Sequence, residues 1–359
     1  MINNFNEIFI LLRYPLIGLF SCLTILTFFW MAIFKALNLK EYNNIQRVHT
    51  NEVSRLGGLF IYFFFWIILL FDIFDNDLFL NILVSSLPFI IFAVKEDIFH
   101  NTSQLVRLSS MAVSCFIFFF INPYQFPKID IYYLGDLINY YPISLVFFSF
   151  TVLVLMNGHN FIDGINGLFG FTALFQLFSI IILASAHNDL DVVHLCIVFA
   201  LPLMTYLLFN FPFGKLFAGD TGAYFYGYSN AIICIYFFGK NDGLLSWLAV
   251  LIMFYPCLEL LFSLIRKLIN KSSPFDPDKR HLHTILFIFL KKKFKVYLAS
   301  ILCIFIMFPI FGFSFLIFLV FTDFIFFDLK TVFLFIFLIT FFYLILYRML
   351  NNIINGYEL

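Results

Sequence analysis

The stretch Met156-Asn-Gly-His-Asn-Phe-Ile-Asp-Gly-Ile-Asn-Gly-Leu168 sets polar side chains at a spacing of three inside an otherwise apolar chain. The four residues at this spacing are Asn157, Asn160, Asp163 and Asn166. If the stretch is helical, each step of three residues advances by about 300°, so the four side chains would drift slowly around one face and converge. Its glycines would let a backbone or a ligand approach closely. The stretch is therefore either a polar site or a polar turn between two membrane spans.

The composition indicates an integral membrane protein. Of the 359 residues, 63% are hydrophobic and only 12% are charged, whereas soluble domains average about 45–50% and about 25%. About ten or eleven helices of roughly 20 residues fit in this length. We therefore expect an all-α, polytopic membrane helix bundle of about 10–11 spans, with residues 1–359 forming a single transmembrane domain. The six cysteines stand singly in apolar runs, which gives metal or disulfide roles little support.

Apolar segments of spanning length recur along the whole chain. They are residues 15–34, 58–74, 79–94, 105–121, 142–157, 167–186, 192–210, 221–238, 244–265, 295–321 and 331–349. Threaded alternately, they place on one side the C-terminus and the loops 35–57, 95–104, 158–166, 211–220 and 266–294. All but four of the 21 Lys and Arg residues fall on that side or at its helix ends. By the positive-inside rule this side is cytoplasmic, the N-terminus is periplasmic and the C-terminus is cytoplasmic.

The first of these loops contains Arg47, His49 and Arg55 and ends on the pair Gly57-Gly58. Basic residues that mark the inner membrane surface explain the arginines. They do not explain a glycine pair at the start of a helix. Its backbone N–H groups can meet an anion.

Acidic residues mark two further positions. Glu96 and Asp97 are adjacent at the end of the third expected span, shortly before Arg107. An aspartate at the centre of a bilayer costs roughly 2.5–3.5 kcal/mol, and two neighbouring carboxylates also repel each other. A cation or a proton between them would relieve this, so metal binding or proton transfer is favoured over a structural role. Glu259 lies inside the expected span 244–265 and is a functional candidate for the same reason.

Asp220 stands between Gly219 and Gly222 at the start of the expected span 221–238, shortly after Phe217. A carboxylate at this place can be a helix N-cap and nothing more. The small residues around it also fit a metal-bound phosphate at a helix N-terminus. Both interpretations stay open at this point.

The longest loop carries Arg280, His281 and His283. Before them, Asp276 and Pro277 have the pattern of an N-cap and the first residue of a helix. Its apolar face would consist of Leu282, Ile285, Leu286 and Phe289. We therefore expect a helix on the membrane interface, with the basic residues toward its polar side. There they fit anion contacts better than a zinc site, for which ligands are too few.

Taken in order, these motifs resemble the polyprenyl-phosphate N-acetylhexosamine-1-phosphate transferases, a family of membrane enzymes. The resemblance extends from Arg47 to Leu286. It rests on the Arg-x-His and Arg-x-Gly-Gly loop, the acidic pair, the Asn-x-x-Asn-x-x-Asp-Gly-x-Asn-Gly-Leu stretch, Phe-x-Gly-Asp, and Ser-Pro-Phe-x-Pro-Asp followed by His-x-His. Each motif alone is weak evidence for the family. Five of them in this order, all on one predicted side of the membrane, are specific for it. Three positions depart from the common family pattern, namely Glu96, Asn166 and Thr284.

The resemblance implies transfer of a sugar-1-phosphate, of an N-acetylhexosamine derivative, from a UDP-sugar to undecaprenyl phosphate. UMP would be released, and synthesis of a lipid-linked surface polysaccharide such as O-antigen would begin. The family pattern implies that Asp220 and Asn160 hold Mg²⁺, with Mn²⁺ as an alternative. It gives the handling of the lipid phosphate or its proton to Asp97 and Asp163, supported by Glu96. The substrate contacts that it implies are Asn157, Asn166, Phe217, Arg47, His49, Arg107, Arg280, His281 and His283.

We expect a UDP-sugar, undecaprenyl phosphate and membrane lipid as partners in a bacterial inner membrane, with a homodimer left open and no nucleic acid. A transporter or lipid-linked flippase would also explain the hydrophobicity and the acids in the spans. It would, however, predict repeated halves and polar residues near the bilayer midplane, whereas here the polar groups gather at one face. A third alternative, an inactive scaffold relative, is permitted by Asn166 and Thr284.

Overall fold

The computed structural model of the chain describes residues 23, 24, 26, 27, 54–122, 126–129, 134–241, 243–273, 280–312 and 328–357. Every regular element in these ranges is a helix, which confirms the all-α expectation. Six of these helices are long and apolar enough to cross a membrane, so the protein is membrane-embedded. The six are α3 (Asp77–Phe99), α4 (Gln104–Ile121), α6 (Tyr141–Ile162), α7 (Leu168–Ala186), α8 (Leu190–Asn210) and α15 (Leu329–Tyr357).

Shorter or less apolar helices complete the part of the chain that is described. They are α2 (Gly57–Leu70), α5 (Leu134–Ile138), α9 (Gly219–Lys240), α10 (Trp247–Ile252), α11 (Phe254–Ile269), α12 (Leu282–Lys291) and α13 (Val296–Phe311). From 58–74 onward, each expected span contains a helix. The span 244–265 contains two, α10 and α11. The first expected span, 15–34, lies outside the described residues apart from four positions.

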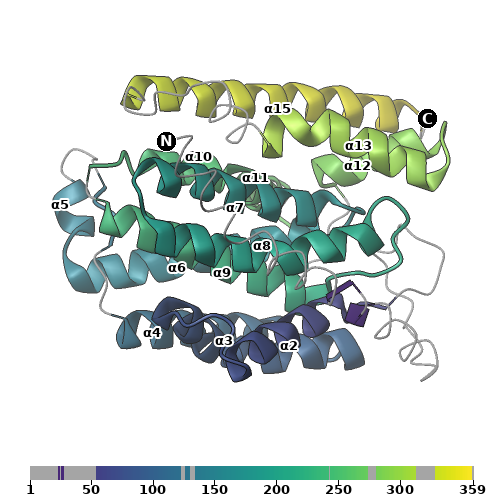
Figure 1. Cartoon of the computed structure of the whole chain (residues 1–359). Coiled ribbons are helices and arrows are strands. Elements are labelled where there is room, and N and C mark those ends of the chain that lie inside the picture. Colours follow the sequence, from purple (N-terminus) through teal and green to yellow (C-terminus); the bar gives the residue numbers. More distant parts are fainter. Residues whose placement is uncertain are drawn as a thin grey trace.

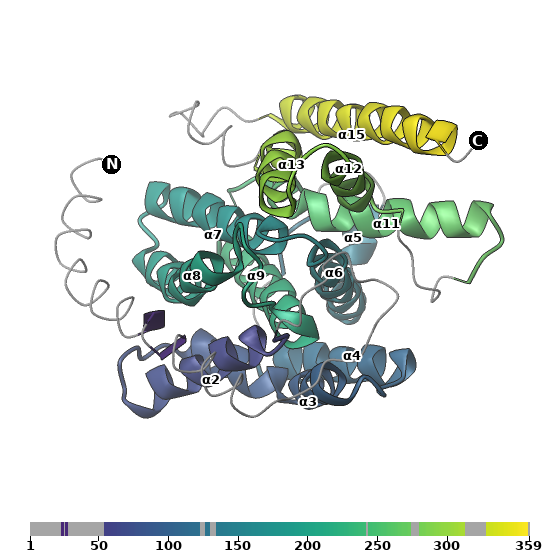
Figure 2. The same cartoon turned by 90° about the vertical axis from the view of Figure 1, so that its right-hand side faces the viewer.

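Helix α9 lies at the centre of the bundle, with α2, α3 and α4 on one side of it and α6, α7 and α8 around the rest (Figure 2). Nearly all of its side chains are buried. This position explains why its sequence is rich in Gly and Tyr and can also contain Ser229 and Asn230, because it faces other helices and not lipid. Small residues permit close contact, and a Cβ at Gly227 would lie 2.7 Å from the Cα of Met156 on α6.

A buried polar network joins three helices in this core. Nε2 of His159 on α6 lies 2.9 Å from Oε1 of Gln176 on α7. The same oxygen accepts a hydrogen bond of 2.9 Å from Nδ2 of Asn230 on α9. His159 belongs to the polar stretch 156–168. Its side chain faces the core of the bundle and stabilises the contacts among α6, α7 and α9.

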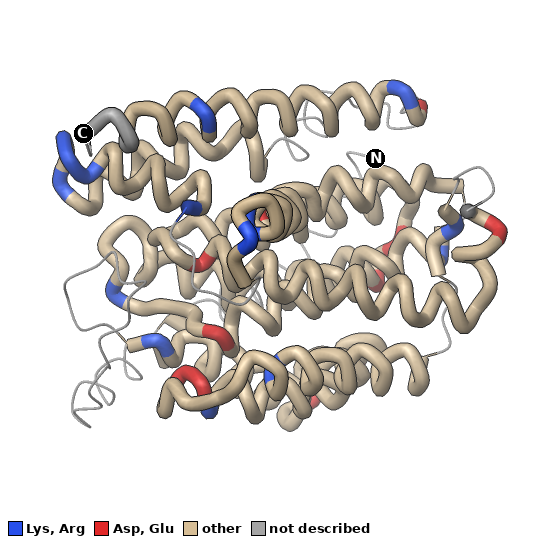
Figure 3. The backbone as a smooth tube through the Cα atoms, turned by 180° about the vertical axis from the view of Figure 1, so that it is seen from behind, with Lys and Arg blue, Asp and Glu red and all other residues tan. Residues whose placement is uncertain are grey.

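The C-terminal helices form a separate layer. Helices α12, α13 and α15 lie together above α10 and α11 (Figure 1). Most of the described Lys and Arg residues lie toward the end of the molecule that carries the C-terminus (Figure 3). Charge is therefore distributed unequally between the two ends of the bundle, as the loop counts predicted. Which end faces the cytoplasm stays a prediction.

Candidate functional site

Backbone pairing brings the segment before α2 against the start of α9. The N–H groups of Gly57 and Gly58 donate to the carbonyls of Phe217 and Ala218 at 2.9 and 3.0 Å, and the N–H of Phe217 donates to the Ser54 carbonyl at 2.9 Å. The expectation that the glycine pair offers its N–H groups to an anion is therefore wrong, because the chain itself uses them. The pairing fixes the backbone of this segment, and so it holds Arg55 beside α9.

Asp97 caps α9 from another helix. Its Oδ1 accepts the N–H of Asp220 at 2.8 Å, and its Oδ2 accepts the N–H and the Oγ1–H of Thr221 at 2.9 and 2.6 Å. These are N–H groups of the first helical turn, which have no partner inside the helix, and a carboxylate is also favoured there by the helix dipole. Gly219 permits this approach, because its φ is +66° and a Cβ would lie 2.5 Å from Oδ1 of Asp97.

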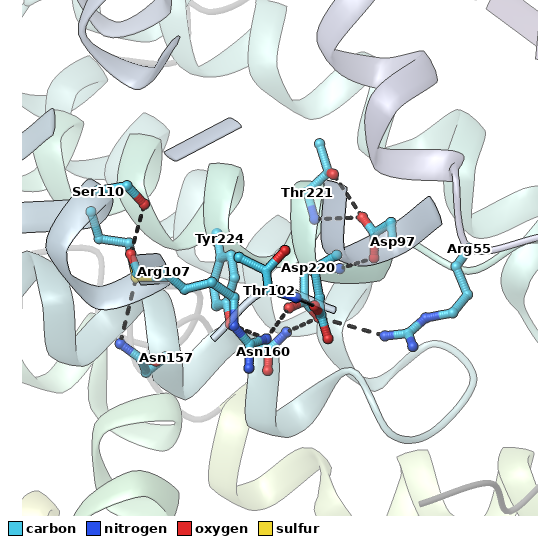
Figure 4. A network of polar contacts seen from close by, with 12 residues as sticks. Arg55, Asp97, Thr102, Arg107, Ser110, Asn157, Asn160, Asp220, Thr221 and Tyr224 are labelled. Atoms are coloured by element: carbon cyan, nitrogen blue, oxygen red, sulfur yellow. Dashed lines mark hydrogen bonds and ion pairs between the residues drawn. The ribbon is translucent and has the colours of Figure 1, made fainter. Parts of the chain in front are cut away.

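Asp220 is not the N-cap of α9, so the interpretation of this carboxylate as a helix cap alone is wrong. The N-cap is Ala218, and the side chain of Asp220 makes no capping bond. Instead, its Oδ2 lies 2.5 Å from Nη1 of Arg107, and its Oδ1 accepts from Nδ2 of Asn160 at 3.0 Å (Figure 4). Nη2 of Arg55 lies 3.5 Å from the same Oδ1. One carboxylate thus joins α9 to α4, to α6 and to the segment before α2.

A third carboxylate, Asp163, lies beside this group at the C-terminal end of α6. Burial raises its pKa well above the usual range of an aspartate; the charge of Arg55 opposes this shift, and the charges of Asp97 and Asp220 add to it. Burial disfavours the charge on Arg55, yet the neighbouring acids, Asp220 first, raise the pKa of its guanidinium. The site is therefore an anionic cluster around a half-buried arginine.

The donor set at Asp220 fits a magnesium ion that also binds substrate. Within the residues that the structure describes, no three His, Cys, Asp or Glu side chains are grouped to hold a metal by themselves. Mg²⁺ usually takes only one or two carboxylates and completes its shell with phosphate oxygens and water. Asp220 supplies a carboxylate and Asn160 brings a carboxamide beside it. A cation there would compete with the guanidinium of Arg107.

The acidic pair does not act as one unit. Oε2 of Glu96 accepts the N–H of Thr102 at 2.8 Å and so stabilises the turn between α3 and α4, while Asp97 turns toward α9. The expectation that a cation or a proton lies between the two carboxylates is therefore wrong. Consecutive residues of a helix point about 100° apart, which separates the side chains.

The polar stretch is helical only as far as Ile162, so its four side chains do not converge on one point. Nδ2 of Asn157 donates to the Leu153 carbonyl at 2.8 Å within α6. Nδ2 of Asn166 donates to the Pro212 carbonyl at 3.0 Å, on the loop before α9. Its Oδ1 is buried and has no hydrogen-bond partner in the structure. Of the four, Asn160 reaches Asp220 directly and Asp163 lies beside the cluster.

The histidine motif is buried, contrary to the exposed position expected for it. Helix α12 begins at Leu282, and the expected start at Asp276 and Pro277 lies outside the described residues. Nδ1 of His281 lies 3.0 Å from Oε1 of Glu259, and Nδ1 of His283 lies 3.0 Å from the hydroxyl of Tyr255. The helix packs against α13 and α15, and Leu282, Ile285 and Leu286 of its expected apolar face are buried within the protein.

Burial lowers the pKa of His283 to about 4, although the Glu259 carboxylate opposes the shift. The imidazole is therefore neutral near neutrality. Its Nε2 is buried with no hydrogen-bond partner in the structure, and a Cβ built on Gly164 would lie 3.6 Å from it. His283 thus faces the loop that carries Asp163.

Four predicted site residues remain: Arg280, Phe217, Arg47 and His49. Arg280 is exposed and its carbonyl accepts from Nη1 of Arg266 at 2.6 Å, while Phe217 is half-buried beside the start of α9. Arg47 and His49 lie outside the described residues, so their assignment stays a prediction.

Sequence reasoning missed several residues that build the site. Thr221 shares the cap with Asp97, and the hydroxyl of Tyr224 lies 3.4 Å from Nη1 of Arg107. Asn210 accepts the N–H of Gly167 at 2.6 Å and donates to the Leu216 carbonyl at 2.8 Å, so it fixes two site loops together. Asn210 stood out as a polar residue at the end of an apolar span, which was the available signal.

Comparisons with known proteins support the family resemblance. Residues 79–238, from α3 to α9, match the model of glycosyl transferase family 4. A probable undecaprenyl-phosphate N-acetylglucosaminyl 1-phosphate transferase of Bacillus subtilis is 24% identical, over 66% of this chain and 66% of its own length. The undecaprenyl-phosphate alpha-N-acetylglucosaminyl 1-phosphate transferase of Thermotoga maritima is 26% identical, over 67% of this chain and 70% of its own length. That of Escherichia coli K12 is 22% identical, over 76% and 75%. The resemblance drawn from the motifs is confirmed.

Proposed function

We infer that this chain, which belongs with the polyprenyl-phosphate sugar-1-phosphate transferases, is a membrane enzyme that transfers a sugar-1-phosphate to a polyprenyl phosphate. The observation that carries the inference is the Asp220 carboxylate. It is buried at the start of the central helix, with Arg55, Arg107 and Asn160 around it. Such a site suits two phosphate-bearing substrates, one of which comes from the lipid.

In finer detail, we propose that the donor is a UDP-sugar, with an N-acetylhexosamine, and that the acceptor is undecaprenyl phosphate. An oxygen of the lipid phosphate attacks the β-phosphorus of the UDP-sugar, and the bond from that phosphorus to the bridging oxygen breaks. UMP leaves with the bridging oxygen. The product begins a lipid-linked surface polysaccharide, and the site faces the cytoplasm of a bacterial inner membrane.

The two arginines suit this reaction because both substrates are anions. Arg55 and Arg107 would lower the repulsion between the two phosphates and stabilise the charge that the leaving UMP gains. Mg²⁺, with Mn²⁺ as the alternative, would be held by Asp220 and Asn160 and would offset charge on the phosphate oxygens. Arg107 already touches the oxygen that a metal would use, so binding of the cation and release of this arginine toward substrate would be coupled.

Asp97 and Asp163 differ in how readily each carboxylate could exchange a proton. Asp97 would have to give up three hydrogen bonds to α9 before its carboxylate could act as a base, so we assign it to positioning Asp220. Asp163 is half-buried and its raised pKa favours the protonated form, so it is the better candidate to exchange a proton with the lipid phosphate. Little base assistance is needed, because the second pKa of a phosphate monoester is about 6.

The nucleotide would lie on the side of the loop before α9. Asn166 donates to the Pro212 carbonyl of this loop and offers a buried carboxamide oxygen without a partner in the structure. Phe217 is a half-buried ring on the loop itself. We propose that they hold the uridine by hydrogen bonding and by stacking. Arg107, His281 and His283 would contact phosphate or sugar oxygens.

The test is an activity assay on the purified protein in lipid nanodiscs. Undecaprenyl phosphate, Mg²⁺ and a panel of UDP-sugars are supplied, and UMP release and the lipid product are measured. The proposal expects UMP release that requires both the lipid and the cation. A transporter or flippase would release no UMP, and an inactive relative would bind a UDP-sugar without turnover; either result would refute the proposed activity.

A further inference from the structure

A buried carboxylate on α11 holds the histidine motif. Glu259 is fully buried, and its Oε1 lies 3.0 Å from Nδ1 of His281 and accepts the N–H of Leu282 at 3.3 Å. Its Oε2 accepts the hydroxyl of Tyr343 on α15 at 3.1 Å. A carboxylate in such a place is tolerated only with several donors. Here the donors come from the start of α12 and from the C-terminal helix.

The second histidine is held from the same face of α11. Tyr255, four residues before Glu259, places its hydroxyl 3.0 Å from Nδ1 of His283. Residues four apart share a helix face. The two imidazoles are nearly parallel, with centroids 5.5 Å apart and planes 7° apart. Helix α11 therefore contacts both rings through Nδ1.

This arrangement turns the other side of each ring away from α11. Nε2 of His283 lies near Gly164, in the turn that follows Asp163. The ring of His281 lies 5.1 Å from that of Phe161, centroid to centroid. Both rings thus border the end of α6, where Asn160 and Asp163 join the carboxylate cluster. The Nε2 atoms are the polar atoms of the rings that α11 does not use.

The hydrogen positions follow from the partners. A carboxylate only accepts, so Nδ1 of His281 carries a hydrogen. In a doubly protonated imidazole Nε2 also carries a hydrogen, which can be donated to an anion. When the Tyr255 hydroxyl donates to Nδ1 of His283, the hydrogen of that ring lies on Nε2 and faces the turn at Gly164.

We propose that Glu259 and Tyr255 are positioning residues that set the orientation and the tautomer of His281 and His283 for contact with a phosphate or diphosphate group, and that Tyr343 fixes Glu259. The proposal rests on the proposed function, since it takes the ligand to be the diphosphate of a nucleotide sugar. It gives α15 a definite role, although this helix lies outside residues 79–238 and most of its described side chains are exposed. Tyr343 is a buried exception.

The experiment compares Glu259→Gln, Tyr343→Phe and a matched control. Glutamine keeps an acceptor oxygen for the Nδ1–H of His281 but removes the charge, and phenylalanine removes only the hydroxyl. The control is Tyr62→Phe, which removes another buried hydroxyl, bonded at 3.0 Å to the Leu83 carbonyl between α2 and α3. kcat and KM for the UDP-sugar are measured beside the Tm of each purified variant.

We expect kcat to fall about 10- to 100-fold in Glu259→Gln and Tyr343→Phe, the range seen when a group that orients a functional histidine is removed. KM should rise by up to about tenfold, because the histidines contact the diphosphate of the UDP-sugar. Tm should fall no further than in Tyr62→Phe, which should keep the kcat of the wild type. Unchanged kcat in both variants, or an equal loss of kcat in Tyr62→Phe, would overturn the proposal. If Glu259→Gln does not fold, Tyr343→Phe decides.

A wild-type protein that releases no UMP would refute the proposed function and leave the positioning role to be decided by binding. Calorimetry with inorganic diphosphate is then applied to the wild type and the same variants. Binding about tenfold weaker in Glu259→Gln or Tyr343→Phe, on the scale of a lost orienting contact, supports the role of the two residues. Equal binding in all proteins overturns it.

Discussion

At the scale of single residues, the site depends on how each buried acid is compensated. Asp220 contacts hydrogen-bond donors on both oxygens, and Asp97 accepts three hydrogen bonds at a helix start. Burial raises the pKa of Asp163. The three carboxylates therefore have different properties, although they surround the same arginine, and replacing each one by asparagine should have a different result.

Replacing Asp220 by asparagine removes the charge that a cation and both arginines need. Because Asp220 is not the helix cap, α9 should still form, and we expect turnover to fall at least about 100-fold. UMP release and thermal unfolding are measured together. Asp189→Asn serves as the control, since Asp189 is also buried and pairs with Lys240 at 3.0 Å, away from the site. Wild-type turnover in the Asp220 variant would show that no essential cation binds there.

Asp163→Asn should make the protein more stable at neutral pH and less active. The folded state raises the pKa of this carboxyl, so it holds the proton more tightly than the unfolded chain does. The resulting cost of ionisation is absent below the ordinary aspartate pKa of about 3.9 and grows as the pH rises toward the folded value. The variant should therefore unfold at a higher Tm than the wild type near neutrality, and the gap should close in acid. The exposed Asp136→Asn should show no such gap. A variant less stable than the wild type at neutral pH would contradict the sign.

At the scale of elements, contacts between segments distant in the sequence decide the geometry. The pairing of residues 54–58 with 217–218 and the cap from α3 both converge on the first turn of α9. A helix of this composition needs such anchors, because its N-terminal N–H groups would otherwise be buried without partners. The position of Asp220 is thus determined by α2 and α3 as much as by α9 itself.

Gly58→Ala should disturb this junction. A Cβ at Gly58 would lie 2.1 Å from the backbone nitrogen of Gly222, and a backbone atom cannot move aside as a side chain can. We expect a loss of about 1–3 kcal/mol in the free energy of unfolding, as for overpacked cores, together with reduced turnover because Arg55 is displaced. Gly243→Ala is the control, since nothing lies within 4 Å of its Cβ position. Equal stability of the two variants would show that the backbone at this junction can move to make room for the Cβ.

How far the sequence could predict these elements depends on whether the determining contact is local. Runs of about 20 apolar residues predicted the spans because each helix satisfies its own backbone in lipid. Asp97 and Asp220 could be identified as candidates because carboxylates are unusual at the ends of apolar spans. The cap that joins them could not be predicted, because it links residues 123 positions apart. For the same reason Glu259 was identified as a candidate, whereas its partner Tyr343 was hidden among the aromatic residues of α15.

At the scale of the whole molecule, the site lies where the start of one central helix meets the ends of several others. The residues of the cluster come from five separate segments, each near the end of a helix, and they meet in one polar network (Figure 4): Arg55, Asp97, Arg107, Asn160 and Asp220. A lipid phosphate and a water-soluble nucleotide can meet only at such an end, because the nucleotide cannot enter the hydrocarbon core. The orientation of that end in the membrane therefore decides which nucleotide pool the site can use.

The charge distribution predicts that the site faces the cytoplasm. All 21 Lys and Arg residues except Arg13, Lys128, Lys240 and Lys330 fall on the predicted inner side, and cytoplasmic loops carry such an excess. Single cysteines placed at Asp136 and Asp242 in intact cells should react with a membrane-impermeant maleimide, whereas cysteines at Asn43 and Ser272 should react only after the cells are opened. The background should be low, because the native cysteines that the structure describes are buried or partly buried: Cys115, Cys196, Cys234 and Cys303 are buried, and Cys257 is partly buried. A cysteine-free parent protein measures the labelling that remains. Reversed labelling would place Asp220 on the outside, out of reach of cytosolic UDP-sugars, and would refute the proposed donor even if the fold and the carboxylate cluster stand.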